Sequence, residues 1–240
     1  MASLFALANP KRFLDISAPV LPWLVGATVL TLGAGMVLGF LAPPDYQQGD
    51  TVKIMFLHVP AAWTAMMAYG LLAVASLFSL VWRHPLADVA AKAAAPLGAV
   101  FTLLGLITGS LWGRPMWGTY WVWDARLTSF LLLLFLYLGY IALWNAIEDE
   151  VRAARAAAIL ALVGLPNLFI IKFSVEWWST LHQGESLMRS DGSHIASVFL
   201  WPLLLSGLGY TLLFFTLWTL RIRTEILERR ARALLLAGAA

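Results

Sequence analysis

The chain contains no cysteine and few charged residues. The lack of cysteine excludes a disulfide framework, a thiolate metal site, thiol redox chemistry and a C-x-x-C-H attachment motif on this chain. Charged residues make up 12% of the 240 residues and hydrophobic residues 61%, whereas a soluble domain has about 25% charged residues. With a mean hydropathy of +0.80, the composition indicates a membrane protein. The net charge of +3 is not gathered into the basic patch typical of nucleic-acid binding.

Six apolar segments are long enough to cross a membrane as helices, because a hydrocarbon core of about 30 Å takes about 20 helical residues. The ten-residue alternating segments of a transmembrane barrel are not seen. The sequence therefore predicts an all-α polytopic membrane protein, a single six-helix domain over residues 1–240. Pro166 is expected to kink the fifth span. The spans are residues 21–42, 56–82, 91–111, 127–147, 156–175 and 196–220.

Residues 1–20 are too short for a span. Their apolar residues, Phe5, Leu7, Phe13 and Leu14, surround two cations and favour an amphipathic helix at the membrane surface, broken at Pro10. A frayed terminus is the alternative. No signal-peptide cleavage pattern follows, so the first span is expected to be retained.

The tail from residue 221 is predicted to continue the last span as a basic helix. Glu225 and Arg229, and likewise Glu228 and Arg232, have the i,i+4 spacing of ion pairs on one helix face. We expect this helix end to lie on anionic lipid.

The distribution of Lys and Arg predicts the orientation. Eleven of the 16 basic residues fall on the side of the chain termini and five on the other side. Because cytoplasmic segments carry the excess of Lys and Arg, both termini are predicted to be cytoplasmic. The connections at residues 43–55, 112–126 and 176–195 then face the opposite side.

The connection at residues 112–126 holds four tryptophans, one tyrosine and a single aspartate. An indole combines a large apolar ring with one N–H donor, which suits a boundary between lipid and water. We expect this stretch to form a loop that presents a flat apolar platform at the membrane surface.

Two of the four histidines lie on the platform's side among apolar residues. His58 opens the second span, and His182 follows the fifth. Taken singly, each suits an interfacial core position; together they are the minimum set for a flat aromatic cofactor with iron at its centre, held by one imidazole on each face. His194 lies in a polar loop on the same side, and His84 is expected to be a solvated residue on the opposite side.

Two rival functions remain open at this point. A quinol-oxidising cytochrome would hold haem through histidines inside the spans, and no histidine falls at mid-span. A haem-translocating permease would need ionisable groups along a mid-membrane path, and the spans hold almost none. The rim position of the histidines favours a protein that holds haem for transfer.

The charged residues near the platform have several possible roles. Asp124 starts the fourth span, where a carboxylate can cap a helix. Arg114 and Arg126 are placed to pair with Asp124, to reach lipid head groups or to meet haem propionates. Glu176 is placed to orient an imidazole N–H.

The motifs match a known family. Trp117-Gly118-Thr119-Tyr120-Trp121-Val122-Trp123-Asp124 resembles the W-G-x-x-W-x-W-D signature of the tryptophan-rich haem-handling proteins of cytochrome c maturation. The segments around His58 (57–60) and His182 (174–183) resemble the two histidine segments of the haem exporter protein C family within this group. The likeness covers essentially the whole chain, which is too short for the related haem lyases.

The resemblance implies a non-enzymatic subunit that binds haem b without a covalent bond, at the periplasmic face of the bacterial inner membrane. His58 and His182 are its implied axial ligands. It implies delivery to a periplasmic haem chaperone, with a small single-span accessory subunit, a second membrane subunit and an ATP-binding subunit in an ABC-transporter-like complex. The expected haem-contacting residues are Trp117, Gly118, Trp121, Trp123, Asp124, Arg126, Glu176, Trp177 and Trp178.

Overall fold

The computed structural model describes residues 9–182, 184 and 195–238. This part of the chain is helical, without strands, which confirms the predicted all-α class. Six helical stretches, with α6 and α7 counted together, are long and apolar enough to cross a membrane. The elements are α2 (Pro10–Leu41), η1 (Asp50–Ile54), α3 (Met55–Trp82), α4 (Ala87–Trp117), α5 (Ala125–Ala146), α6 (Glu150–Gly164), α7 (Pro166–Trp177) and α8 (Ser197–Gly238).

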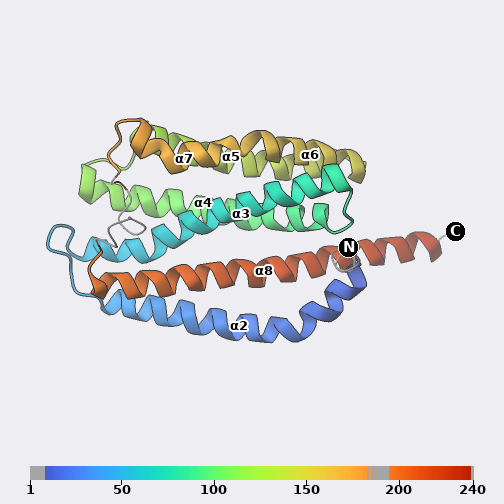
Figure 1. The fold of residues 1–240 in the computed structure, drawn as a ribbon, viewed down its shortest axis with the longest axis horizontal. Helices are drawn as coiled ribbons and strands as arrows, with labels where there is room; N and C mark the ends of the chain where they lie inside the picture. The colour runs from blue at the N-terminus through green and yellow to red at the C-terminus, as the bar shows by residue number, and fades with distance from the viewer. Residues whose placement is uncertain (1–8, 183, 185–194, 239–240) are drawn as a thin grey trace.

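The helices run side by side along the long axis of the molecule (Figure 1). α2 packs along α8, α3 and α4 pack against each other at the centre, and α5 with α6 and α7 forms the other side. The start of α2 and the end of α8 lie at the same end of the bundle, and α8 extends beyond the other helices there. We call this end the terminal end, and the other the connection end. The cytoplasmic location of the terminal end stays a prediction from the charge distribution.

The first helix begins earlier than predicted. The Asn9 side chain accepts the backbone N–H of Lys11 at 2.9 Å and caps α2, and Pro10 at the first helical position needs no hydrogen bond of its own. Residues 10–20 therefore belong to one continuous helix with the first span, so a separate surface helix or a frayed end is wrong for these residues. Phe5 and Leu7 lie outside the described residues.

The third span, α4, is longer than predicted. Residues 112–117 form the last turns of α4 and not a loop, because Pro115 lies too close to the helix end to disrupt more than its final turn. The helix ends at Gly118, whose φ of 75° is the left-handed conformation of a C-cap, and its N–H donates to the Arg114 carbonyl at 3.0 Å. Only residues 118–124 of the tryptophan-rich stretch are non-helical.

The fifth span is interrupted at Pro166, as predicted. α6 ends at Gly164 and α7 begins at Pro166. Close to this break, the buried Asn167 donates through Nδ2 to the Ser129 carbonyl of α5 at 2.9 Å. The amide ties α7 to the neighbouring helix inside the bundle.

Large tyrosines fill the interior where the helices approach closely. Tyr69 and Tyr137 are fully buried, and their rings meet edge to face at 5.2 Å. The Tyr137 hydroxyl donates to the Ala65 carbonyl at 2.8 Å. A Cβ added at Gly98 would overlap the Tyr137 ring, so the space for this ring depends on the glycine.

We expect Gly98→Ala to destabilise the protein by about 1–3 kcal/mol, because the added methyl group overpacks the core against Tyr137. Thermal unfolding in detergent measures the effect. Gly70→Ala in α3 is the matched control, since a Cβ there meets nothing within 4 Å. Equal midpoints for the two variants would show that the packing around Tyr137 is looser than described.

Candidate functional site at the connection end

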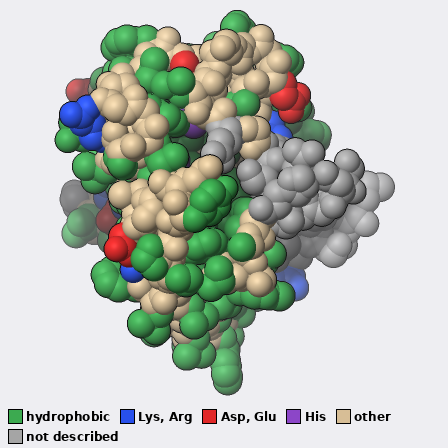
Figure 2. Space-filling model, turned by 90° about the vertical axis from the view of Figure 1, so that its left-hand side faces the viewer, with side chains coloured by type: hydrophobic (Ala, Val, Ile, Leu, Met, Phe, Trp, Pro, Cys, Tyr) green, Lys and Arg blue, Asp and Glu red, His purple; other side chains and the backbone are tan. Residues whose placement is uncertain are grey.

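The residues of the predicted site lie at the connection end. The chain segments between α2 and α3, between α4 and α5, and after α7 all lie at this end (Figure 1). Figure 2 looks onto it and shows apolar side chains in green among other side chains and backbone in tan, with histidine visible only as a small patch in a recess. His58 and His182 are both only partly exposed.

His58, on the first turn of α3, is held through one ring nitrogen. Its Nδ1 lies 3.0 Å from the Gly105 carbonyl oxygen and 3.2 Å from the Thr108 hydroxyl, both on α4. Because a carbonyl only accepts hydrogen bonds, Nδ1 carries the proton and Nε2 the lone pair. No described residue hydrogen-bonds this Nε2. Trp112 lies edge-on to the imidazole at 5.8 Å.

His182, in the segment after α7, is held in the same manner by a carboxylate. Its Nδ1 lies 3.2 Å from Oδ2 of Asp124. The other oxygen of Asp124 accepts the Leu127 N–H at 2.8 Å, so the predicted N-cap is confirmed and one side chain serves both α5 and the histidine. The Trp117 ring contacts the imidazole at 4.8 Å. Within the part of the chain that is described, His182 Nε2 has no hydrogen-bond partner.

Burial lowers the pKa of His182 below its ordinary value of 6.5, although the nearby Asp124 carboxylate acts in the opposite direction. The Asp124 side chain is 7% exposed and that of His182 17%. The imidazole is therefore neutral at pH 7, with its Nε2 lone pair available to a ligand.

The end of α4 brings the two histidines together. Trp112 and Trp117 are five residues apart on this helix, and each contacts one of the imidazoles. His58 and His182 therefore both lie beside the last turns of α4. Two neutral imidazoles oriented through Nδ1 beside aromatic rings are a ligand pair suited to a metal in a planar cofactor. The described residues hold no group of three or more His, Cys, Asp and Glu suited to a bare metal ion.

The other predicted tryptophans at the connection end differ in exposure. Trp121 and Trp123 contact each other edge to face at 5.4 Å. The Trp121 indole N–H is buried without an acceptor among the described residues, and Trp123 is 75% exposed. At the end of α7, Trp177 and Trp178 are exposed and lie 5.7 Å apart.

The two arginines do not pair with Asp124. Arg126 donates through Nε to the Ser174 hydroxyl of α7 at 3.3 Å. Arg114 donates to the Gly118 carbonyl and lies 5.5 Å from the Tyr120 ring. Both side chains thus fasten elements of the site to each other.

Glu176 does not orient either imidazole. It is exposed on α7, and Asp124 takes the role predicted for it beside His182. His194 lies outside the described residues. His84 lies in the connection between α3 and α4, away from the site, where its Nδ1 accepts the Leu86 N–H at 3.3 Å.

Three α4 residues that hold His58 were not predicted. Gly105 and Thr108 contact its Nδ1, and a Cβ added at Gly109 would lie 2.7 Å from its Cε1. The only sequence signal is the small size of residues 105, 108 and 109 on one apolar helix, a pattern that ordinary helix packing also produces.

Comparison with known proteins identifies the family. The family model described as Heme exporter protein C matches residues 3–237. Heme exporter protein C of Bradyrhizobium diazoefficiens is 63% identical over 97% of this chain and 88% of that relative. Proteins of the same name from Escherichia coli K12 and Paracoccus denitrificans are 51% and 49% identical over 96% and 97% of this chain, and over 93% and 97% of their own lengths. This chain therefore belongs to the Heme exporter protein C family, as its tryptophan and histidine motifs predicted.

Proposed function

We propose that this chain binds haem b between His58 and His182 and delivers it, on the periplasmic side of the bacterial inner membrane, to a periplasmic haem chaperone during cytochrome c maturation. The relatives' name, Heme exporter protein C, supports haem as the cargo. We propose no catalytic residue on this chain.

One observation carries the proposal. Both imidazoles are fixed through Nδ1, and both leave Nε2 without a partner among the described residues. A histidine that serves as an axial ligand binds iron through one ring nitrogen while the other donates to a carbonyl or a carboxylate. The histidines therefore have the hydrogen bonding expected of iron ligands.

The surrounding residues suit the remaining parts of haem. Trp112 and Trp117 present apolar rings beside the two imidazoles. The unpaired indole N–H of Trp121 is a donor for a propionate, and the Arg126 guanidinium supplies a positive charge near His182. His58 and His182 would hold the haem iron through Nε2.

The two ligands are anchored differently. His58 belongs to a helix and bonds to α4, whereas His182 lies on a non-helical segment and depends on Asp124. We propose that during delivery His182 lets go of the haem first, while His58 still holds it. The exposed Trp123, next to Asp124 in the sequence, is the proposed contact for the chaperone. A small single-span accessory subunit, a second membrane subunit and an ATP-binding subunit complete the proposed ABC-transporter-like complex.

A permease that moves haem through the bundle fits the interior less well. The space between α3, α4 and α5 is filled by Tyr69, Tyr137 and Tyr140, which are among the largest fully buried side chains. Haem could pass there only if these helices separated. The packed interior supports haem handling at one membrane face.

The delivery step is tested with haem-loaded protein and a purified periplasmic haem chaperone. We expect Trp123→Ala to keep its haem but to transfer it about tenfold more slowly, the typical effect of removing an exposed tryptophan anchor. Trp23→Ala is the matched control, because Trp23 is 81% exposed on α2, away from the site. The proposal fails if wild-type protein retains haem but never transfers it, and the role of Trp123 fails if both variants transfer equally.

A further inference from the structure

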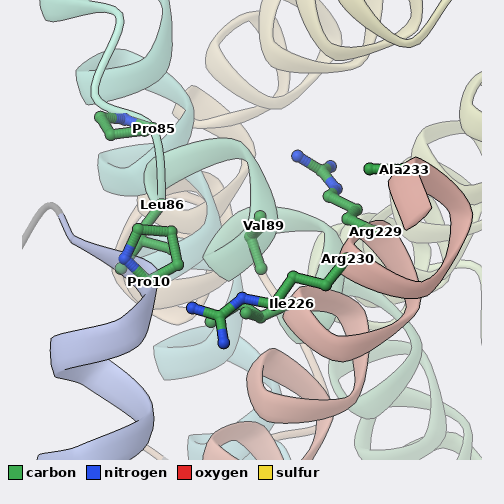
Figure 3. A pocket seen from close by; sticks show the side chains of 8 residues that line it. All are labelled: Pro10, Pro85, Leu86, Val89, Ile226, Arg229, Arg230 and Ala233. Carbon is green, nitrogen blue, oxygen red and sulfur yellow. The ribbon is translucent and has the colours of Figure 1, made fainter. Parts of the chain in front are cut away.

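A cavity of about 310 Å³ lies at the terminal end, away from the candidate haem site. It is bounded by the start of α2, the connection between α3 and α4, and the extension of α8 (Figure 3). Its lining is mainly apolar and comes from Pro10, Pro85, Leu86, Val89 and Ile226. Leu86, Val89 and Ile226 belong to a small buried cluster of their own, which gives the cavity a firm apolar floor.

The cavity lies at the level of the membrane interface. Trp218 of α8 donates its indole N–H to the Ala90 carbonyl at 2.7 Å, next to the cavity residue Val89. Trp82 ends α3 just before the connection that carries Pro85. Because tryptophans gather at the depth of lipid head groups, the cavity lies where a phospholipid places its glycerol and phosphate.

Two neighbouring arginines of α8 differ in their ion pairing. Arg229 also lines the cavity, but it is paired with Asp88 at 2.9 Å and with Glu225 at 3.0 Å. Arg230 makes no ion pair or hydrogen bond with any described residue, and its guanidinium extends across the cavity toward Pro10 and Leu86. Of the two cations that line the cavity, Arg230 is therefore the one that no described residue pairs.

Three acidic residues at this end are engaged by other cations, whereas Asp15 on α2 and Glu228 on α8 are exposed. Asp88 and Glu225 pair with Arg229, Glu225 also accepts from Lys92 at 2.8 Å, and Glu150 pairs with Arg232 at 2.9 Å. Exposed cations follow Pro10 and precede Pro85 in the sequence, at Lys11, Arg12 and Arg83. The exposed cations around the apolar floor, with Arg230 among them, outnumber the exposed carboxylates of α2 and α8, so the rim carries a net positive charge.

We propose that this cavity binds an anionic phospholipid, with its phosphate at Arg230 and the start of its acyl chains against Leu86, Val89 and Ile226. Basic pockets between membrane helices recognise anionic head groups in this manner. The apolar floor favours a lipid over a free phosphate ion. A bound lipid joins α2 to α8 at this end, and the proposal does not depend on haem binding.

Native mass spectrometry of the full-length protein with added phosphatidylglycerol or phosphatidylcholine tests the site. We expect wild-type protein to retain phosphatidylglycerol preferentially and Arg230→Ala to weaken that binding about fivefold, the effect of one cation at the membrane surface. Arg155→Ala is the matched control, because Arg155 is another exposed arginine, on α6 near the terminal end. Ala233→Trp, which fills the cavity from its exposed rim, should weaken binding while the protein stays folded.

Three results would overturn the proposal. Equal losses for Arg155→Ala and Arg230→Ala would mean that general surface charge attracts the lipid. Equal retention of phosphatidylcholine would mean that Arg230 does not select the head group. Displacement of the lipid by excess inorganic phosphate would identify a site for the free ion.

Discussion

His58→Ala and His182→Ala each lose haem when the protein is purified from cells supplied with it, whereas His84→Ala keeps the wild-type content. Each of the first two variants removes a neutral imidazole whose Nδ1 is already engaged and whose Nε2 faces no described partner. We expect haem retention to fall at least about tenfold, which corresponds to about 1.4 kcal/mol. The haem-to-protein ratio after purification measures it.

His84 is a suitable control because it lies in the connection between α3 and α4, where its Nδ1 accepts a backbone N–H. Thermal unfolding of the haem-free proteins separates ligand loss from misfolding, and free imidazole should restore haem binding to a folded variant. If both site variants kept wild-type haem content, the assignment of the axial ligands would be wrong.

Asp124→Asn binds haem about 10- to 100-fold more weakly than wild-type protein, the usual cost of losing a group that orients a metal ligand. Asparagine caps helices as well as aspartate does, so the start of α5 stays intact. What is lost is the carboxylate, 3.2 Å from His182 Nδ1, that makes the imidazole a stronger donor. Titration of the haem-free protein with haem measures the affinity.

Asp124→Ala adds the loss of the helix cap, which costs about 1 kcal/mol of stability. Asp149→Ala is the matched control, because Asp149 caps α6 by accepting the Arg152 N–H at 2.7 Å and contacts no histidine. A haem affinity for Asp124→Asn equal to that of wild type, or a loss as large for Asp149→Ala, would contradict a role for Asp124 in holding His182.

The spans and the family could be predicted from the sequence because each depends on a continuous stretch of residues. Apolar runs of about 20 residues have few alternatives to a membrane helix, and the tryptophan motif is specific. The ends of the helices were harder to predict. Pro10 begins a helix and Pro115 lies within the last turns of one, because the effect of a proline depends on how many backbone hydrogen bonds remain beyond it.

The partners of the histidines depended on tertiary packing. Asp124 was correctly predicted as a helix cap, but its second bond joins residues 58 positions apart. Glu176 was predicted to orient the imidazole because it lies only six positions before His182. The carboxylate that contacts His182 is instead that of Asp124, from the connection between α4 and α5. Likewise Gly105 and Thr108 reach His58 only because α3 packs along α4. Contacts between distant segments leave no periodic or local trace in one sequence.

The absorption spectrum of purified haem-loaded protein tests the central claim most directly. If haem lies between His58 and His182, the wild-type protein gives a six-coordinate, low-spin bis-imidazole spectrum, and each single alanine variant loses it. A five-coordinate, high-spin spectrum of the wild type, or a low-spin spectrum unchanged in both histidine variants, would contradict the account.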